Sequence, residues 1–254
     1  MNTIYIIIFF ILGSLMGSFY TVVGLRLPKK ENFINSHSRC DSCEHELKLY
    51  EMIPLFSYIF QRGRCRYCNK KIDILSTYME FFTGLLFAVA FYSFSFSYEL
   101  LIALGLISML IIIAVSDLTY LIIPDQVLIF FSVYFLSINI LNLGVYKGLL
   151  TILNGIFLFL IMYLIMLFGN KLLKKESLGG GDIKMMFVFG LVLEPLLGVL
   201  TIFLGSLIAL PVSCLLLLKN KEKVIPFGPF LLIAINLIYF MKITTQMILA
   251  FLSF

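Results

Sequence analysis

Apolar stretches about twenty residues long recur along this chain and limit its possible folds more than any other feature. They follow one another almost without interruption after residue 75. A helix needs about 20 apolar residues to cross the hydrocarbon core of a bilayer. Hydrophobic residues make up 61% of the 254 and charged residues 13%, against roughly 45–50% and 25% in soluble domains. A water-soluble fold is therefore excluded.

The pattern predicts an all-α membrane protein, a polytopic bundle of about eight transmembrane helices. The first apolar run is too long for a cleavable signal peptide, has no basic start and no small-residue cleavage site after it, so we expect it to be retained. The pairs Gly13-Ser14 and Gly17-Ser18 suit close helix contact. The expected spans lie at about residues 3–25, 77–97, 100–119, 126–145, 148–168, 183–195, 197–218 and 226–250.

Basic residues predict the orientation, because cytoplasmic loops carry an excess of Lys and Arg. Of the 19 basic residues, ten lie between Arg26 and Lys71, four between Lys171 and Lys184, and three between residues 219 and 223. All 17 fall on one side of the predicted topology. We therefore expect the N-terminus outside and the long polar loop in the cytosol. The net charge of +5 is a topology signal and does not indicate a nucleic-acid partner.

The polar loop at residues 26–75 holds four of the five cysteines, Cys40, Cys43, Cys65 and Cys68. Two Cys-x-x-Cys pairs separated by 21 residues are close to the spacing of a four-thiolate zinc site. Disulfides are the alternative, but they are rare in the reducing cytosol. His37 and His45 could replace a thiolate, and we leave both outside the site. The loop is too short to be stable through a core alone, so a structural zinc ion would stabilise it.

These features divide the chain into a first helix at 1–25, a zinc-binding loop at 26–75 and a membrane core at 76–254. The fifth cysteine, Cys214, lies inside the seventh predicted span without a partner. We interpret it as a small buried hydrophobe.

Acidic residues inside a bilayer are costly and indicate function. Asp117 lies near the inner end of the third span and Asp182 at the inner end of the sixth, so the topology places both at one face. Two carboxylates in an apolar site share a proton, so one acts as base toward water while the other polarises a carbonyl. Their position at one membrane face therefore favours aspartic-peptidase chemistry with Asp117 and Asp182 as the pair.

The residues around this pair have simpler interpretations. Asp125 follows a proline and suits the N-cap of the fourth helix. The glycines at 179–181 would give the backbone before Asp182 access to unusual dihedrals, or form a flexible turn. Lys184 is either an inside anchor or a charge that keeps one aspartate ionised.

Seven segments resemble, in order and spacing, the type IV prepilin peptidases, which are leader peptidases and N-methyltransferases. The four-cysteine loop is one of them. The others are GSFYTVVGLRLP at 17–28, IPLFSYIFQRGRCRYC at 53–68, MEFFTGLLF at 79–87, SDLTYLIIPD at 116–125, GGGDIK at 179–184 and IPFGPFL at 225–231.

The resemblance implies that Asp117 and Asp182 are the catalytic pair and that the four cysteines bind zinc. It also implies that the loop region helps to methylate the new N-terminus with S-adenosylmethionine. The implied location is a bacterial cytoplasmic membrane. The implied partners are prepilin or pilin-like precursors, cut on the cytosolic side just before an apolar helix. Pilus assembly, protein secretion and DNA uptake all remain open as the process served.

Two other kinds of function stay open. An ion-coupled transporter would also carry membrane acids and glycine-interrupted helices, but we find no internal repeat of either aspartate segment. A zinc scaffold without activity would explain the loop and leave Asp117 without a role.

Overall fold

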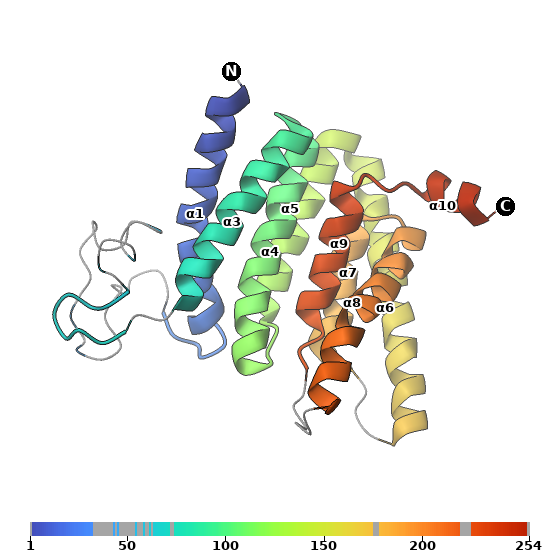
Figure 1. Ribbon diagram of the computed structural model, residues 1–254. Helices are drawn as coiled ribbons and strands as arrows, with labels where there is room; N and C mark the ends of the chain where they lie inside the picture. Colours follow the sequence, from blue (N-terminus) through green and yellow to red (C-terminus); the bar gives the residue numbers. More distant parts are fainter. Residues whose placement is uncertain are drawn as a thin grey trace. The chain divides into compact units, whose positions relative to one another are not determined.

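The computed structural model is helical throughout its longer described segments (Figure 1). It describes residues 2–32, 43, 45, 54, 58, 61, 63–71, 74–174, 178–218 and 225–252. Within these residues the only β-type contact is an isolated bridge between Arg64 and Lys71, so the predicted all-α class is confirmed. The helices are α1 (Asn2–Arg26), α3 (Ile74–Phe94), α4 (Tyr98–Tyr120), α5 (Asp125–Leu143), α6 (Val145–Leu173), α7 (Gly180–Val192), α8 (Pro195–Leu218), α9 (Gly228–Phe240) and α10 (Thr245–Leu252).

Among the described residues, six helices are long and apolar enough to cross a membrane: α1, α3, α4, α5, α6 and α8. Their exposed faces carry large apolar side chains such as Ile4, Phe130 and Phe168, which suits contact with lipid. The predicted count of eight spans is therefore too high. The helices α7 and α9 have 13 residues each, so each is only about 20 Å long against a core of about 30 Å.

The last predicted span, at 226–250, is also wrong as a single helix. It is divided into α9 and α10 by a turn in which Lys242 adopts a left-handed φ of 51°. The amide of Ile243 donates to the carbonyl of Ile238 at 3.2 Å, as in a helix C-terminal motif that satisfies the last carbonyls. Apolar residues continue on both sides of this turn, so counting them along the sequence does not reveal the break between the two helices.

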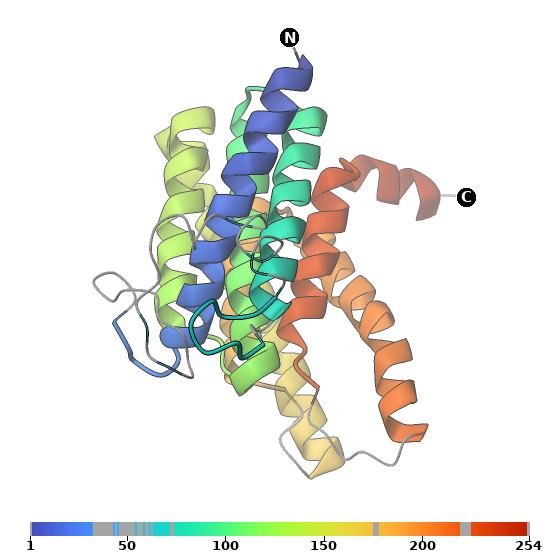
Figure 2. The ribbon, with the colours of Figure 1, turned by 60° about the vertical axis from the view of Figure 1, so that its left-hand side comes forward.

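Contacts divide the chain into two compact units, residues 1–96 and residues 97–254. In the first unit α1 and α3 lie side by side (Figure 2). A Cβ on Gly13 would stand 2.7 Å from the carbonyl oxygen of Thr83, and one on Gly17 would stand 2.9 Å from that of Met79. The predicted role of these glycines in close helix contact is confirmed. Here α3 groups with α1, while the predicted functional division at residues 25 and 75 remains a prediction.

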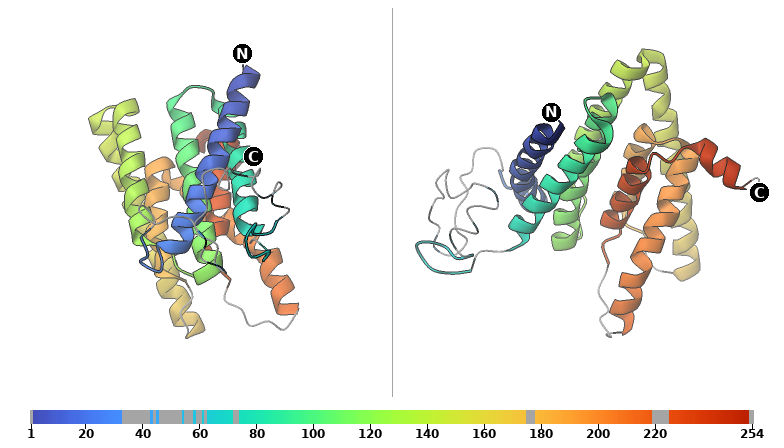
Figure 3. Two further views of the ribbon diagram at one scale, coloured as in Figure 1. Left: turned by 90° about the vertical axis from the view of Figure 1, so that its left-hand side faces the viewer. Right: turned by 45° about the horizontal axis from the view of Figure 1, so that its top comes forward.

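The second unit is built around α4, whose inner residues are buried along most of its length. It packs against α5 and α9. The helix α7 packs against both α5 and α6, and α8 packs against α9. Figure 3 shows the tight turn between α5 and α6 at the top of its right-hand view. Gly144, the residue between the two helices, has a φ of +85°. The side chain of Asn139 on α5 donates to the carbonyl of Leu191 on α7 at 2.6 Å. This packing holds the ends of α4, α7 and α9 in place.

Candidate active site

Asp117 lies in the last turn of α4, where it is 6% exposed. The helix ends three residues later at Tyr120. The C-cap residue, Leu121, adopts a left-handed φ of 56° and donates its amide to the carbonyl of Asp117 at 2.9 Å. The neighbouring Ser116 hydroxyl donates to the carbonyl of Ile122 at 2.5 Å. The end of α4 is thus held by local hydrogen bonds, and the Asp117 side chain is free to turn inward.

Asp182 occupies the first turn of α7, two residues after the helix begins, and it is also 6% exposed. Its carboxylate accepts a hydrogen bond from the backbone of Gly179, the N-cap residue. An acid at this position satisfies a free amide of the helix N-terminus. The other oxygen, Oδ1, is buried and has no hydrogen-bond partner among the described residues. It is therefore available to a group that enters the site.

The two carboxylates meet at Gly228, the first residue of α9. A Cβ on this glycine would stand 3.0 Å from Oδ2 of Asp117 and 3.4 Å from Oδ1 of Asp182. The backbone of Gly228 also hydrogen bonds to the Asp117 carboxylate. The structure thus brings together the two acids that the sequence analysis paired, and Asp182 offers to this shared point the oxygen that has no partner.

Three helix ends contribute to the electrostatic field at this arrangement, and the C-terminal end of α4, with its partial negative charge, opposes the two N-terminal ends. The N-termini of α7 and α9 carry Asp182 and Gly228, while Asp117 comes from the C-terminal turn of α4. A helix N-terminus carries a partial positive charge that stabilises an anion nearby. Two such ends therefore stabilise one negative charge on the pair.

Ile123 packs against two of the glycines that surround the pair. A Cβ on Gly181 would stand 2.8 Å from the Cβ of Ile123, and one on Gly228 would stand 3.1 Å from its Cδ1. The expectation of unusual dihedrals in the glycine triplet is wrong, because Gly179 has φ −70° and ψ 140° and the next two residues are helical. Gly181 is instead required for close packing of the first turn of α7 against Ile123.

Asp125 does not cap α5, contrary to the prediction. It is the first residue of that helix, the N-cap is Pro124, and no side chain accepts a capping hydrogen bond there. Both oxygens of Asp125 instead accept hydrogen bonds from Lys184 Nζ, at 2.8 and 2.9 Å. The charge of Lys184 is thus directed to Asp125, so the alternative in which it keeps a catalytic aspartate ionised is not supported.

Three of the four predicted zinc ligands lie together in the first unit. The Sγ atoms of Cys43, Cys65 and Cys68 are all within 4.8 Å of one another. Cys40 falls outside the described residues. His45 stacks on Tyr67, with ring centroids 3.6 Å apart.

The cysteine geometry fits a metal better than a disulfide. The Sγ atoms of Cys43 and Cys65 are 3.9 Å apart, too long for a bond between sulfurs. Tetrahedral zinc with Zn–S distances of about 2.3 Å separates its sulfurs by about 3.8 Å. The turn that follows Cys65 is closed by hydrogen bonds from Asn69 N to Cys65 O and from Cys65 N to Lys70 O, each 2.9 Å long. The donor set therefore fits zinc.

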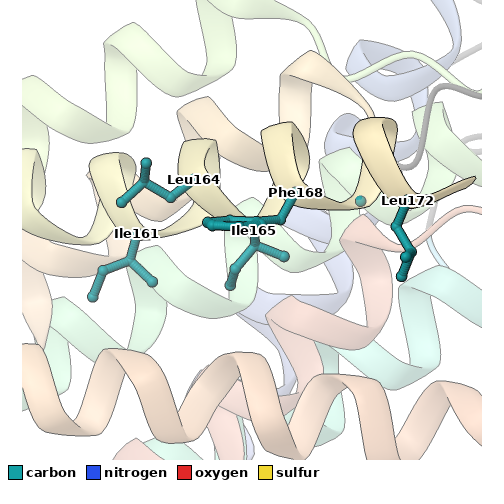
Figure 4. Close-up of a pocket in the computed structure, with 6 residues that line it drawn as sticks. Ile161, Leu164, Ile165, Phe168 and Leu172 are labelled. Carbon is teal, nitrogen blue, oxygen red and sulfur yellow. The ribbon is translucent and has the colours of Figure 1, made fainter. Parts of the chain in front are cut away.

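Two further features lie outside both sites. Cys214 is exposed on α8, so its predicted burial is wrong: it lies on a helix face that suits lipid. A pocket along the C-terminal half of α6 is lined by Gly169 and five apolar side chains. Figure 4 shows these five side chains on the helix: Ile161, Leu164, Ile165, Phe168 and Leu172. Neither aspartate lines it, so it contributes no acid-base chemistry.

Sequence reasoning assigned no role to Gly228. The residue lies in the segment IPFGPFL, which carried part of the resemblance, but a glycine before a proline is usually interpreted as a helix start. Only the positions of two carboxylates from other helices show that the space beside it is occupied.

Comparisons with known proteins identify the family of the chain. Residues 11–94 match the model of the bacterial peptidase A24 N-terminal domain, and residues 104–214 match the type IV leader peptidase family. These ranges fall within the first and second compact units. No solved structure matches the chain significantly.

Relatives named prepilin leader peptidase/N-methyltransferase match over most of the chain. The one from Bacillus subtilis is 35% identical over 227 residues, covering 87% of this chain and 88% of the relative. The one from Pseudomonas aeruginosa is 29% identical and covers 88% and 86%. The one from Vibrio cholerae is 27% identical and covers 94% and 98%. Two family models match in order, and the Bacillus subtilis relative is 35% identical over 87% of this chain. The chain therefore belongs to the type IV leader peptidase family.

Proposed function

We propose that this chain is a membrane-embedded aspartic endopeptidase that removes the leader peptide of type IV prepilin or pilin-like precursors. The observation that carries the proposal is the approach of Asp117 Oδ2 and Asp182 Oδ1 to the same point beside Gly228. Both acids are buried in a helical unit otherwise rich in apolar side chains. Family membership and the names of the relatives support the same activity.

The geometry supports a one-proton, two-carboxylate mechanism. Two carboxylates this close cannot easily both ionise, so they hold one proton between them. The ionised member takes a proton from water while the water oxygen bonds to the scissile carbonyl carbon, and the protonated member donates to the carbonyl oxygen. When the C–N bond breaks, a proton passes to the departing amine. The unpartnered Asp182 Oδ1 is the oxygen best placed to contact the entering water or carbonyl.

The second activity proposed is N-methylation of the newly exposed N-terminus, with S-adenosylmethionine as the methyl donor. It rests on the resemblance of the sequence and on the second half of the relatives' name. Zinc bound by Cys43, Cys65 and Cys68, with Cys40 as the fourth ligand, would stabilise the loop of the first unit. The described residues do not identify where the methyl donor binds.

The proposed side of cleavage is the cytosol. Seventeen of the 19 basic residues belong to the segments on the same predicted side as the loop and the aspartates, and basic loops stay in the cytoplasm.

The test is co-expression with a pilin-like precursor followed by N-terminal sequencing of the product. We expect the wild type to cleave and methylate, and Asp117→Asn and Asp182→Asn each to lose cleavage. An amide keeps the shape of the acid but can neither accept nor share the required proton. Asp125→Asn is the matched control, a third acid at the same edge that is 59% exposed. Normal cleavage by Asp117→Asn or Asp182→Asn would refute the proposed pair.

A further inference from the structure

Gly228 has little free space beside the two aspartates. A Cβ there would meet Asp117 Oδ2 at 3.0 Å, Ile123 Cδ1 at 3.1 Å and Asp182 Oδ1 at 3.4 Å. Cβ atoms rarely make contacts this short, and two of the three neighbours are the polar oxygens of the site. Any side chain at this position would therefore displace the carboxylates or separate them.

The backbone of Gly228 supplies a second contact. Its amide donates to the Asp117 carboxylate. At the start of a helix the first amides have no partner within the helix. The next residue, Pro229, has no amide, and the amide of Phe230 is directed to the carbonyl of Phe227 at 3.1 Å. Gly228 thus carries the first available donor of α9, and it is directed at the carboxylate.

The helix that carries Gly228 is held firmly. Proline in the first turn of a helix restricts φ to a helical value and orders the start of the helix. Five side chains on α9 are fully buried, at 0% exposure: Leu231, Leu232, Ala234, Ile235 and Ile238. The first turn therefore has little freedom to move away from an added methyl group.

We propose that Gly228 is a positioning residue of the peptidase site, in which the absence of a side chain lets the two carboxylates share one proton and the amide orients Asp117. This inference rests on the peptidase function proposed above. It makes the start of α9 a third element of the site, beside the end of α4 and the start of α7.

The principal test is Gly228→Ala, with leader cleavage followed as kcat and KM on a purified precursor. We expect kcat to fall on the order of 10-fold while KM changes little, because contacts this short require the carboxylates to shift by a few tenths of an ångström and a displacement of about 1 Å can lower the rate about 10²-fold. The matched control is Gly180→Ala at the first residue of α7, where a Cβ would meet no neighbouring atom of the described residues within 4 Å. This variant should keep its kcat, and thermal unfolding compares the stability of the two.

A second variant covers the case in which Gly228→Ala fails to fold. In Ile123→Ala/Gly228→Ala the apolar neighbour is shortened, so the added methyl group meets only the two carboxylates. The double variant is compared with Ile123→Ala as its baseline. It should yield folded protein and cleave with a kcat well below that of Ile123→Ala. If it cleaves at the rate of Ile123→Ala, or if Gly228→Ala keeps the wild-type kcat, the positioning role is wrong.

Asp117→Asn in the same assay separates this inference from the proposed function. If Asp117→Asn still cleaves, the proposed dyad fails whatever Gly228→Ala does. If Asp117→Asn is inactive and Gly228→Ala is fully active, only the inference about Gly228 fails.

Discussion

The three aspartates Asp117, Asp125 and Asp182 of the second unit differ strongly in how far their side chains are buried. Asp117 and Asp182 are 6% exposed, whereas the side chain of Asp125 is 59% exposed and paired with Lys184, itself 54% exposed. An exposed ion pair contributes about 0–1 kcal/mol. Burial and pairing, more than position in the sequence, therefore separate the acids with a proposed catalytic role from the one with a surface role.

Asp125→Asn should accordingly be mild. We expect leader cleavage to continue and the free energy of unfolding to fall by less than about 1 kcal/mol, with a smaller difference at high salt because salt screens the lost pair. Cleavage rate and thermal unfolding at two salt concentrations measure this. Complete loss of cleavage in Asp125→Asn, with Asp117→Asn active, would show that the first member of the dyad had been assigned to the wrong aspartate.

The two buried aspartates should behave as one unit. The double variant Asp117→Asn/Asp182→Asn is expected to be no less active than either single variant, because residues that act together are not additive. Residual cleavage measured at long incubation with purified precursor tests this. A further large loss in the double variant would indicate that the two carboxylates act in separate steps.

Helices in the first unit depend on glycine at their contact. A Cβ on Gly13 would meet the carbonyl oxygen of Thr83 and the Cβ of Phe87, both at 2.7 Å, and a backbone atom cannot rotate away. Close approach of this kind is what small residues allow between membrane helices. The contact between α1 and α3 therefore depends on these positions.

Gly13→Val should force α1 away from α3. We expect a loss of about 1–3 kcal/mol, the usual effect of overpacking a tight contact. The control is Leu12→Val, one residue earlier, where the side chain is 44% exposed and the change should be nearly neutral. Thermal unfolding in one detergent compares them, and equal midpoints for the two variants would contradict the prediction.

The molecule as a whole is expected to carry about one zinc ion per chain. Cys65→Ser should lose it, because Cys65 is 4% exposed and lies within the thiol cluster, whereas Cys214→Ser on α8 should retain it. Metal analysis of purified protein measures this. Methylation should decline more than cleavage, since the two aspartates belong to the other compact unit. Purified protein without zinc and with four oxidised thiols would refute the metal site.

Topology also belongs to the whole molecule. In intact cells of a Cys214→Ser variant, a thiol reagent that cannot cross the membrane should not label Cys68, which is exposed in the protein, or Cys40. The same reagent should label them after the membrane is opened and zinc is removed with a chelator. Labelling from outside intact cells would invert the orientation and with it the proposed side of cleavage.

Most of the architecture followed from local properties of the chain. Apolar runs predicted the long helices, because a helix satisfies its own backbone hydrogen bonds in lipid. Paired cysteines predicted the thiol cluster, and the cost of burying an acid singled out Asp117 and Asp182. Each of these inferences needs only neighbouring residues, or the chemistry of one residue type in one environment.

Other features depend on contacts between distant segments. The partner of Asp125 is Lys184 on another helix, so local capping rules could not find it. The break between α9 and α10 lies inside an apolar run. Hydropathy does not register a change in backbone direction, so it could not predict this break. The role of Gly228 exists only because Asp117 and Asp182 arrive from two other helices and occupy the space that a side chain would need. That space is defined by packing, which no single segment of the sequence contains.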